Sequence, residues 1–363
     1  MKTLLWVMLF FTARGTLAQF SAAFLQNEKY WNDGKAEFDI YDAKLMREGA
    51  LRDCEVTHIL VREPFDPQQL VKPDDWEKPG MISVLKMNQI LHVPTGLYVC
   101  QQMHSAFWRI ENGALLKWSL TSNDSCGNTF KLAHLAASAR SQDIPNLAAA
   151  TGVEVAIPKN GWKYNYSTYW DTMAEGAEGF DLPRAACFYD ELPMRVRTIV
   201  FSTVSTAKPN RPETGVSAGG AESRPAVSET GVPVAPDGKE SEQGLAANRD
   251  RPRTSSTTAS AGSGQFEIQL APSVINSKKD KVVFTPANVS WQKTEREILV
   301  TVAHSGGTDR FTLAPQFPYL LREWKMADGG ELRLKQSLKV DYWRYNKPGD
   351  KERALADPAL QNR

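Results

Sequence analysis

Cysteine and histidine are scarce in this sequence, and neither occurs at a spacing typical of metal binding. The 363 residues contain four cysteines and five histidines. No CxxC motif occurs, and no HxH or HExxH pattern links the histidines. Metal sites often use such short spacings because neighbouring ligands then converge on one ion. The sequence therefore predicts neither a metal site nor a cofactor.

An excess of charge of one sign is also lacking. Lys and Arg total 43 against 42 Asp and Glu, which gives a formal net charge of +1. Proteins that bind nucleic acid or anionic membrane surfaces usually present a strong positive field to the phosphate groups. We therefore expect no nucleic-acid partner.

Long hydrophobic runs are absent beyond the N-terminus. The N-terminus has Lys2, an apolar run over residues 4–11 and small residues near Ala18. This run is shorter than the ~20 residues that a membrane-spanning helix needs, and the whole pattern is that of a secretory signal peptide. We predict a signal peptide over residues 1–18, a mature chain from Gln19 and no transmembrane span. The protein is then exported to a periplasm or to the extracellular space.

An exported compartment permits disulfide bonds. The cysteines are Cys54, Cys100, Cys126 and Cys187, and four cysteines allow three pairings. Cys100 and Cys126 lie on adjacent predicted strands of one hairpin-like region. A bond between these two is the preferred prediction, and simple burial of the thiols is the alternative.

Alternating hydrophobic residues dominate what the sequence does contain. Residues 36–45 place Phe38 and Ile40 on one side of an extended chain and acidic residues on the other, which is the period-two pattern of a half-buried strand. Further strand-like runs follow, and Asn112-Gly113 suits a two-residue hairpin turn. We predict a mostly β, antiparallel fold, which is a curved sheet, an open barrel or two packed sheets.

A compositional break divides the chain. From residue 202 to 265 there is no aromatic, isoleucine, methionine or cysteine residue. Such a segment cannot bury enough apolar surface to offset chain entropy, so we expect a disordered insertion, with a mucin-like stalk as the alternative. Residues 19–201, with a last strand beginning at Met194, form the first part of a β domain. Residues 266–346 close it, and residues 347–363 form a flexible tail.

Several motifs are similar to those of one protein family. They are YWNDGKAEFDIYDAKLMREGALRD, EPFDP with VKPDD, VLKMN, TGLY, SCGNTF, FPYLLREW, GGELRLK and VDYWRYN. In this order they resemble an uncharacterised family of exported bacterial proteins, over most of the mature chain outside the insertion. Some members carry the label "septum formation inhibitor", which does not fit because the serine-proline-arginine phosphate loop of true proteins of that name is missing. The chain departs from the family pattern at Ser125, where an aromatic is expected.

Candidate binding residues come from two sources. The resemblance implies a shared structural or binding site at five positions, Lys35, Glu37, Lys72, Lys86 and Trp324. An aromatic-rich segment adds candidate ligand contacts at Trp162, Tyr164, Tyr166 and Trp170. For the charged residues, an ordinary solvated sheet face is the alternative interpretation. No residue is predicted to be catalytic.

These observations favour a non-catalytic envelope protein that binds an apolar or amphiphilic ligand, or a protein partner, on a concave aromatic-rich face. Two alternatives stay open, a secreted hydrolase that cleaves envelope glycans with carboxylates and a structural scaffold. A buried acid pair with shifted pKa values in a cleft would favour the hydrolase. An apolar cavity without converging acids would favour binding.

Overall fold

The computed structural model of the 363-residue chain describes residues 20–124, 127–136, 161–169, 174–201, 262–273 and 282–362. These residues all belong to one compact unit. The predicted signal peptide, residues 202–261 of the predicted insertion, Cys126 and Trp170 lie outside the described residues. Across the described ranges, no helix has the length and hydropathy needed to cross a membrane.

Fifteen strands of the described residues form a single sheet. The first arm of the sheet consists of β1 (Ala36–Arg47), β2 (Ala50–Phe65), β3 (Ile82–Pro94), β4 (Val99–Arg109), β5 (Leu115–Asp124), β6 (Gly127–Leu135), β7 (Trp162–Ser167) and β8 (Glu175–Phe180). The second arm consists of β9 (Ala186–Phe188), β10 (Gly262–Ala271), β11 (Thr285–Lys293), β12 (Ile298–His304), β13 (Gly307–Leu313), β14 (Leu321–Lys325) and β15 (Glu331–Val340).

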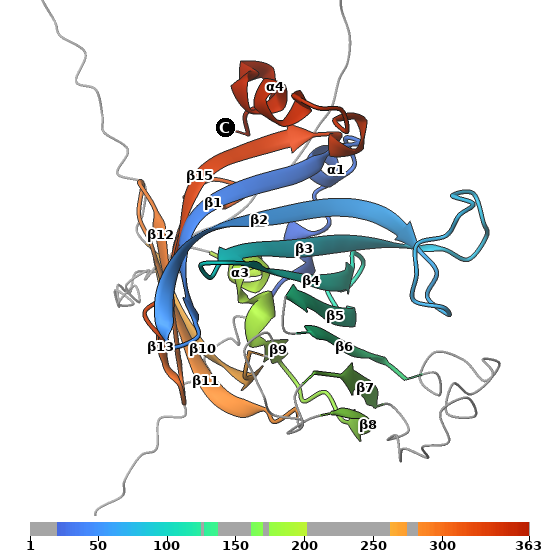
Figure 1. The fold of residues 1–363 in the computed structure, drawn as a ribbon, viewed down its shortest axis with the longest axis vertical. Helices are drawn as coiled ribbons and strands as arrows, with labels where there is room; N and C mark the ends of the chain where they lie inside the picture. The colour runs from blue at the N-terminus through green and yellow to red at the C-terminus, as the bar shows by residue number, and fades with distance from the viewer. Residues whose placement is uncertain are drawn as a thin grey trace, which may run out of the picture. The chain divides into compact units, whose positions relative to one another are not determined.

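The strand order confirms the predicted fold class. It is β8-β7-β6-β5-β4-β3-β2-β1-β15-β14-β13-β12-β11-β10-β9, so β8 and β9 are the two edges of an open sheet. Neighbouring strands are antiparallel apart from β9 and β10. The sheet curves strongly, so its two arms face each other across a concave side (Figure 1).

Turn chemistry explains the hairpins of the first arm. Glu48 and Gly49 connect β1 to β2 with φ values of 51° and 72°, the left-handed conformation that a tight two-residue hairpin turn requires. The predicted two-residue turn at Asn112-Gly113 is wrong, because the connection between β4 and β5 runs over residues 110–114 and only Gly113 among them has a positive φ, of 70°. Glycine adopts this conformation without steric cost, so both positions favour hairpins locally.

Pairing of β1 with β15 joins the first and the last strand of the described chain. The register runs from Ala36 opposite Val340 to Lys44 opposite Glu331, with one irregularity after Ile40. On the far edge, β9 pairs in parallel with β10. The stretches before and after the predicted insertion therefore contribute strands to the same sheet.

Short helical segments complete the fold. They are η1 (Ala22–Phe24), α1 (Glu28–Trp31), η3 (Tyr189–Glu191), α3 (Leu192–Arg195), η4 (Val196–Thr198), η5 (Tyr342–Arg344), α4 (Asp350–Ala356) and η6 (Pro358–Leu360). The predicted strand beginning at Met194 is wrong, because α3 and η4 occupy this stretch. Pro193 suits the first helical turn, where its missing N–H has no partner to lose. The helix α3 lies inside the curve of the sheet (Figure 1).

Two apolar clusters fill the concave side. One joins Val56 of the first arm to Val289 of the second and includes Leu192 of α3. The other gathers large aromatic side chains of the first arm, among them Trp118 and Trp162. Burial of these side chains provides the main driving force for closing the two arms over α3.

The predicted flexible tail is wrong for the residues that the structure describes. The stretch that follows β15 forms η5, α4 and η6, with Ala354 buried. Gln361 bridges to Leu338, and the Asn362 N–H donates to the Ser337 carbonyl at 2.8 Å. A helix this short is unstable alone, so its order comes from tertiary contacts that composition does not reveal.

The predicted C-terminal limit of the insertion also needs correction. Strand β10 begins at Gly262, opposite Lys293 of β11, so residues 262–265 belong to the sheet. Backbone hydrogen bonds form this part of the ladder. The small and polar residues 262–265 can therefore pair in the sheet, although residues of these types have low β propensity and do not predict a strand.

On the concave side, a buried ion pair between Arg197 and Glu37 joins three separate parts of the chain. Arg197 donates from Nη1 and Nη2 to the two carboxylate oxygens of Glu37, at 2.6 and 2.9 Å. Its Nε and Nη2 also donate to the Pro318 carbonyl, at 3.1 and 2.9 Å. The side chains of Arg197 and Glu37 are 2% and 0% exposed. The pair thus holds β1, η4 and the loop before β14 together.

We expect Arg197→Met to lower the free energy of unfolding by about 3–5 kcal/mol, because it leaves the Glu37 carboxylate buried without a counter-charge. Urea unfolding of the full-length protein measures this loss. The double variant Glu37→Met/Arg197→Met should lose less than the sum of the two single variants.

The matched control is Arg333→Met, which removes an exposed arginine 3.5 Å from Glu323. Exposed ion pairs contribute under about 1 kcal/mol. Equal losses for Arg197→Met and Arg333→Met would contradict the stabilising role of the buried pair.

Candidate functional site

A cavity of about 600 Å³ lies where the first strands meet the C-terminal segment. Its walls come from the loop before β1, the end of β2, the segment between β2 and β3, the start of β3, and η5. We call it the lysine–tryptophan cavity after the side chains that distinguish it, namely Lys35, Lys72, Lys86, Trp76 and Trp343.

Strand geometry places part of this set on one face of the sheet. Lys86 on β3 stands directly opposite Val61 on β2, and residues two apart on a strand share a face, so Glu63 joins them. Leu60 points to the other face, into the second apolar cluster. The cavity therefore lies on the outer side of the sheet, away from the concave side.

Positive charge predominates at the lysine–tryptophan cavity. Four of the five charged residues that line it are basic: Lys35, Arg62, Lys72 and Lys86, with Glu63 as the acid. Lys86 Nζ lies 3.0 Å from Glu63 Oε2, and Lys72 Nζ lies 4.0 Å from the same oxygen. Lys35 makes no ion pair with any described residue. The cavity thus has more cationic groups than its own carboxylate can neutralise.

Arg62 is held at the cavity by two contacts. Its Nη1 donates to Glu28 Oε1 at 2.6 Å, and its Nη2 donates to Ser83 Oγ at 3.4 Å. The Glu28 side chain is 60% exposed, so water screens this pair strongly. Arg62 shares its face of β2 with Leu60 rather than with Glu63, and its charge is paired, so the three lysines supply the excess positive charge of the cavity.

Two exposed indole rings flank the basic groups. Trp76 is 61% exposed and Trp343 is 48% exposed, whereas Trp31 at the same cavity is buried at 2%. Lys72 Nζ lies 4.5 Å from the centre of the Trp76 ring, a cation–π contact. Large exposed aromatic rings beside a cavity usually mark a contact surface, because their burial by a ligand is favourable.

The structure brings together only some of the predicted site residues. Lys35, Lys72 and Lys86 line one cavity. Glu37 is instead on the concave side in the ion pair with Arg197. Trp324 is buried on β14, where its Nε1 donates to Asp309 Oδ1 at 2.9 Å.

The aromatic segment does not form an exposed binding face. Trp162 and Tyr164 are 2% and 1% exposed and belong to the second apolar cluster. Tyr166 packs partly buried against that cluster, and Trp170 lies outside the described residues. Cys100 is buried on β4, and its predicted bond to Cys126 involves a residue that the structure does not describe.

No family model, curated protein or solved structure matches this chain. The resemblance to exported bacterial proteins therefore stays a prediction. The function has to be argued from the site itself.

Sequence reasoning missed three residues of the lysine–tryptophan cavity, Arg62, Trp76 and Trp343. Trp76 interrupts a polar, acid-rich segment, and an isolated tryptophan in such a segment is a signal of exposure. Trp343 belongs to the motif VDYWRYN, but the motif alone does not show that this ring lies beside the first strands. No sequence pattern indicated Arg62, because alternation along β2 shows which residues share a face of the strand but not which other elements lie next to that face.

A second group of polar side chains crosses the concave side. Ser337, Asp39, His58, Gln89 and His104 stand opposite one another in register on β15, β1, β2, β3 and β4. None is more than 6% exposed. We call this set the polar row. The polar row separates the two apolar clusters. On β2, for example, Val56 on one side of the row belongs to the first cluster and Leu60 on the other side belongs to the second.

Asp39 of the polar row forms an acid pair with Glu37, which lies two residues earlier on β1. Burial and the adjacent Glu37 charge raise the pKa of Asp39 well above its ordinary value. Burial opposes ionisation of Glu37 as well, but the Arg197 guanidinium overcomes it and lowers the pKa of Glu37. Tyr30 and Ser337 donate hydrogen bonds to Glu37 and Asp39, respectively. Both acids are 0% exposed, and neither lines the lysine–tryptophan cavity.

The polar row also contains two buried histidines, His58 in its middle and His104 at its end on β4. Neither ring nitrogen of His104, nor Nε2 of His58, has a hydrogen-bond partner among the described residues. Burial lowers the pKa of each histidine to about 3, with an added effect of the Arg197 charge on His58. Within the described parts of the chain, no three His, Cys, Asp or Glu side chains are placed to hold a metal ion.

The lowered pKa values of His58 and His104 predict that acid destabilises the folded protein. In the unfolded chain a histidine has a pKa of about 6.5, so between pH 6.5 and 3 the unfolded state binds protons that the folded state does not. The free energy of unfolding then falls as the pH falls, by up to about 1.4 kcal/mol per pH unit for each histidine. We expect His104→Leu to reduce this slope by about one histidine's share, measured by urea unfolding from pH 7 to pH 4.

The control for this prediction is Gln89→Leu, which removes a buried polar side chain of the polar row but no titrating group. Its pH slope should equal that of the wild type, whatever its stability. An unchanged slope in His104→Leu would show that His104 does not resist protonation in the folded state.

Proposed function

We propose that this protein is an exported, non-catalytic binding protein whose lysine–tryptophan cavity takes an amphiphilic anion with a flat ring. The observation that carries the proposal is the meeting of three lysines, which have the single carboxylate of Glu63 between them, with two exposed indole rings around a cavity of about 600 Å³. Small-molecule sites commonly have volumes of about 300–1,000 Å³. The cavity is therefore of a suitable size for one such ligand.

The chemistry of the walls specifies the ligand class. Lys35, Lys72 and Lys86 favour a carboxylate, sulfonate or phosphate group, since each ammonium acts as a point charge. Trp76 and Trp343 favour a flat, weakly polar body that covers their rings. A neutral apolar ligand would leave the lysines unused, and a compact inorganic anion would leave the rings exposed.

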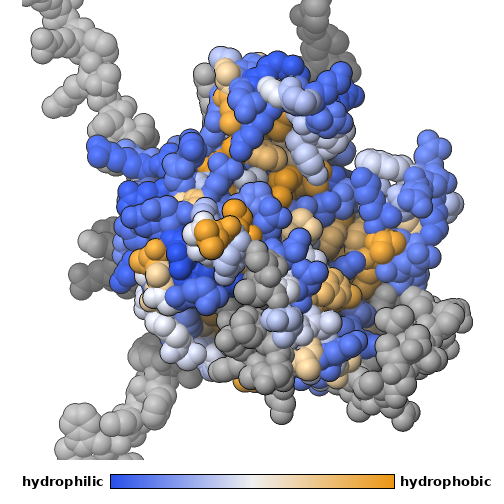
Figure 2. Space-filling model, viewed as in Figure 1, coloured by the Kyte–Doolittle hydropathy of each residue, from blue (hydrophilic) through white to orange (hydrophobic). Residues whose placement is uncertain are grey.

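The surface supports a cavity ligand over a large protein partner. On the face shown in Figure 2, hydrophilic residues predominate and hydrophobic residues form separate patches. Stable protein interfaces usually have a contiguous apolar centre. Binding of a small molecule therefore agrees better with this face than binding of a partner does.

Export is supported by the N-terminal pattern of Lys2, the apolar run and Ala18. We expect mass spectrometry of the denatured protein from its own host to give a chain that begins at Gln19. Spectra recorded under native conditions should add the mass of a bound anion. A chain that retains residues 1–18 would contradict export, and a mass without a ligand would weaken the binding proposal.

A carboxylate-dependent hydrolase is the second candidate, favoured by the acid pair Glu37 and Asp39 with its oppositely shifted pKa values. Against it, both acids are fully buried and engaged by Arg197 and Ser337, so no substrate reaches them in this structure.

A serine hydrolase pattern, GxSxG, occurs at residues 215–219, which lie outside the described residues.

The binding proposal is tested with naphthalene-2-sulfonate, which combines a flat ring and one negative charge. We expect Lys72→Ala and Trp343→Ala each to weaken its affinity about three- to tenfold, the effect of one partly exposed charge or ring contact. Isothermal titration calorimetry on the full-length protein measures this. Affinity should also fall as salt is added, because ions screen the lysines.

The matched control is Lys325→Ala on β14, a lysine that is 52% exposed and not part of the cavity. It should bind the probe like the wild type. Equal binding of neutral naphthalene-2-methanol, or equal losses in Lys325→Ala and Lys72→Ala, would exclude a specific anion site at this cavity.

A further inference from the structure

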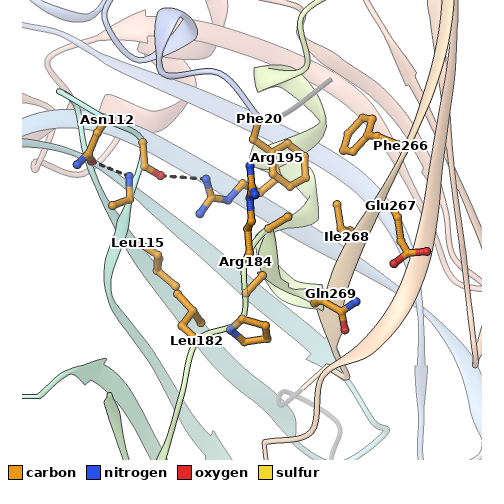
Figure 3. A pocket seen from close by; sticks show the side chains of 15 residues that line it. Phe20, Asn112, Leu115, Leu182, Arg184, Arg195, Phe266, Glu267, Ile268 and Gln269 are labelled. Atoms are coloured by element: carbon orange, nitrogen blue, oxygen red, sulfur yellow. Dashed lines mark hydrogen bonds between the residues drawn. The ribbon is translucent and has the colours of Figure 1, made fainter. Parts of the chain in front are cut away.

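A second cavity, of about 530 Å³, lies on the concave side near the turn between β4 and β5. Five separate parts of the chain line it: Phe20, the turn at Gly113, the segment around Arg184, Arg195 of α3 and the strand β10 (Figure 3). It shares no lining residue with the lysine–tryptophan cavity. We call it the arginine cavity.

One wall of the arginine cavity is apolar. Phe266 and Ile268 on β10 are 9% and 1% exposed, and Leu115 on β5 is 6% exposed. Phe20 packs edge to face on Phe266, with ring centres 5.7 Å apart. No indole ring is among the described residues that line this cavity. An elongated hydrocarbon suits such a wall better than a large flat ring does, because small aliphatic groups and ring edges surround it.

A fixed guanidinium forms the polar wall. Arg195 donates from Nε to Glu191 Oε2 and from Nη1 to the Gly113 carbonyl, each at 3.0 Å, and the second of these bonds is drawn in Figure 3. Its guanidinium also lies 5.5 Å from the ring centre of Phe20. Nη2 has no hydrogen-bond partner in the described part of the chain. Its two N–H groups are therefore available, in a fixed orientation, to an acceptor in the cavity.

A second guanidinium is free to move. Arg184 is exposed, lines the same cavity and makes no hydrogen bond or ion pair with the described residues. The next residue, Ala185, has a φ of 59°, a left-handed conformation that strains a non-glycine residue. Such strain persists where the surrounding structure imposes it. Arg184 is thus held at the cavity by its backbone, while its charge stays uncompensated.

The carboxylate among the described lining residues, that of Glu267, does not neutralise these arginines. Glu267 lies between Phe266 and Ile268 on β10 and is exposed, whereas both neighbours are buried. Successive side chains of a strand point to opposite faces, so the Glu267 carboxylate points away from the apolar wall. Glu191 balances Arg195, which leaves the charge of Arg184 in excess.

We propose that the arginine cavity binds the carboxylate of a single-chain fatty acid, with the alkyl chain along Phe266 and Ile268. The planar guanidinium matches a carboxylate because it offers parallel N–H groups. Arg195 Nη2 holds the head group from the fixed wall, and Arg184 closes on it from the exposed side. This site differs from the one proposed above in place and in ligand class, and it does not depend on it.

The test uses laurate below its micellar concentration, titrated calorimetrically into the full-length protein. Arg184→Ala, which removes an exposed side chain without a partner, should weaken laurate binding about tenfold. Ala114→Trp, at an exposed lining position, should abolish binding by filling the cavity. The control Arg333→Ala, an exposed arginine on β15, should leave binding unchanged.

Three outcomes would overturn the proposal. The first is equal affinity for dodecyltrimethylammonium, which has the same chain and the opposite charge. The second is unchanged laurate binding in Ala114→Trp, with folding verified by circular dichroism. The third is a loss of laurate binding in Lys72→Ala, which would place laurate in the lysine–tryptophan cavity. If Arg184→Ala loses laurate binding but keeps naphthalene-2-sulfonate binding, the two ligands occupy separate sites, so each proposal is tested independently of the other.

Discussion

The ion pair between Arg197 and Glu37 is the constraint on which the rest of the structure depends. A carboxylate and a guanidinium removed from water are stable only if each finds the other and their remaining hydrogen-bonding groups are satisfied. Here the Pro318 carbonyl accepts from the arginine and the Tyr30 hydroxyl donates to the acid. These partners come from distant parts of the chain, so the pair forms only when the two arms of the sheet have closed over α3. It therefore couples the first strand, the helical segment and the loop before β14 in a single arrangement.

The concave side and the outer side of the sheet have different chemical roles because of strand alternation. Glu37, Asp39 and the histidines of the polar row point inward, where burial either pairs them or keeps them neutral. Exposed charge is left to the outer side and to the edge of the concave side, and the two cavities lie there. Lysines with indole rings line one, and arginines with an apolar wall line the other. The two sites are therefore suited to anions of different shape, a flat ring and an extended chain.

The candidate site could be predicted in part. Lys35, Lys72 and Lys86 were identified from the family resemblance, and the structure places all three in one cavity. Arg62 was not found, because a strand pattern shows which residues share a face and not what lies next to that face. The opposite error occurred with Trp162, whose aromatic segment predicted a concave ligand-contacting face. It fills the core instead, since sequence composition does not distinguish a buried aromatic ring from an exposed one.

The sequence by itself determined the class of fold. Period-two alternation and turn residues such as Gly49 and Gly113 act locally, through side-chain direction and φ, and they give antiparallel hairpins without reference to the rest of the chain. Only the tertiary structure decided the pairing of β1 with β15, the helical form of the stretch after Leu192 and the docking of the C-terminal segment that ends at Asn362. Each of these depends on contacts between residues far apart in the sequence, which local propensity does not encode.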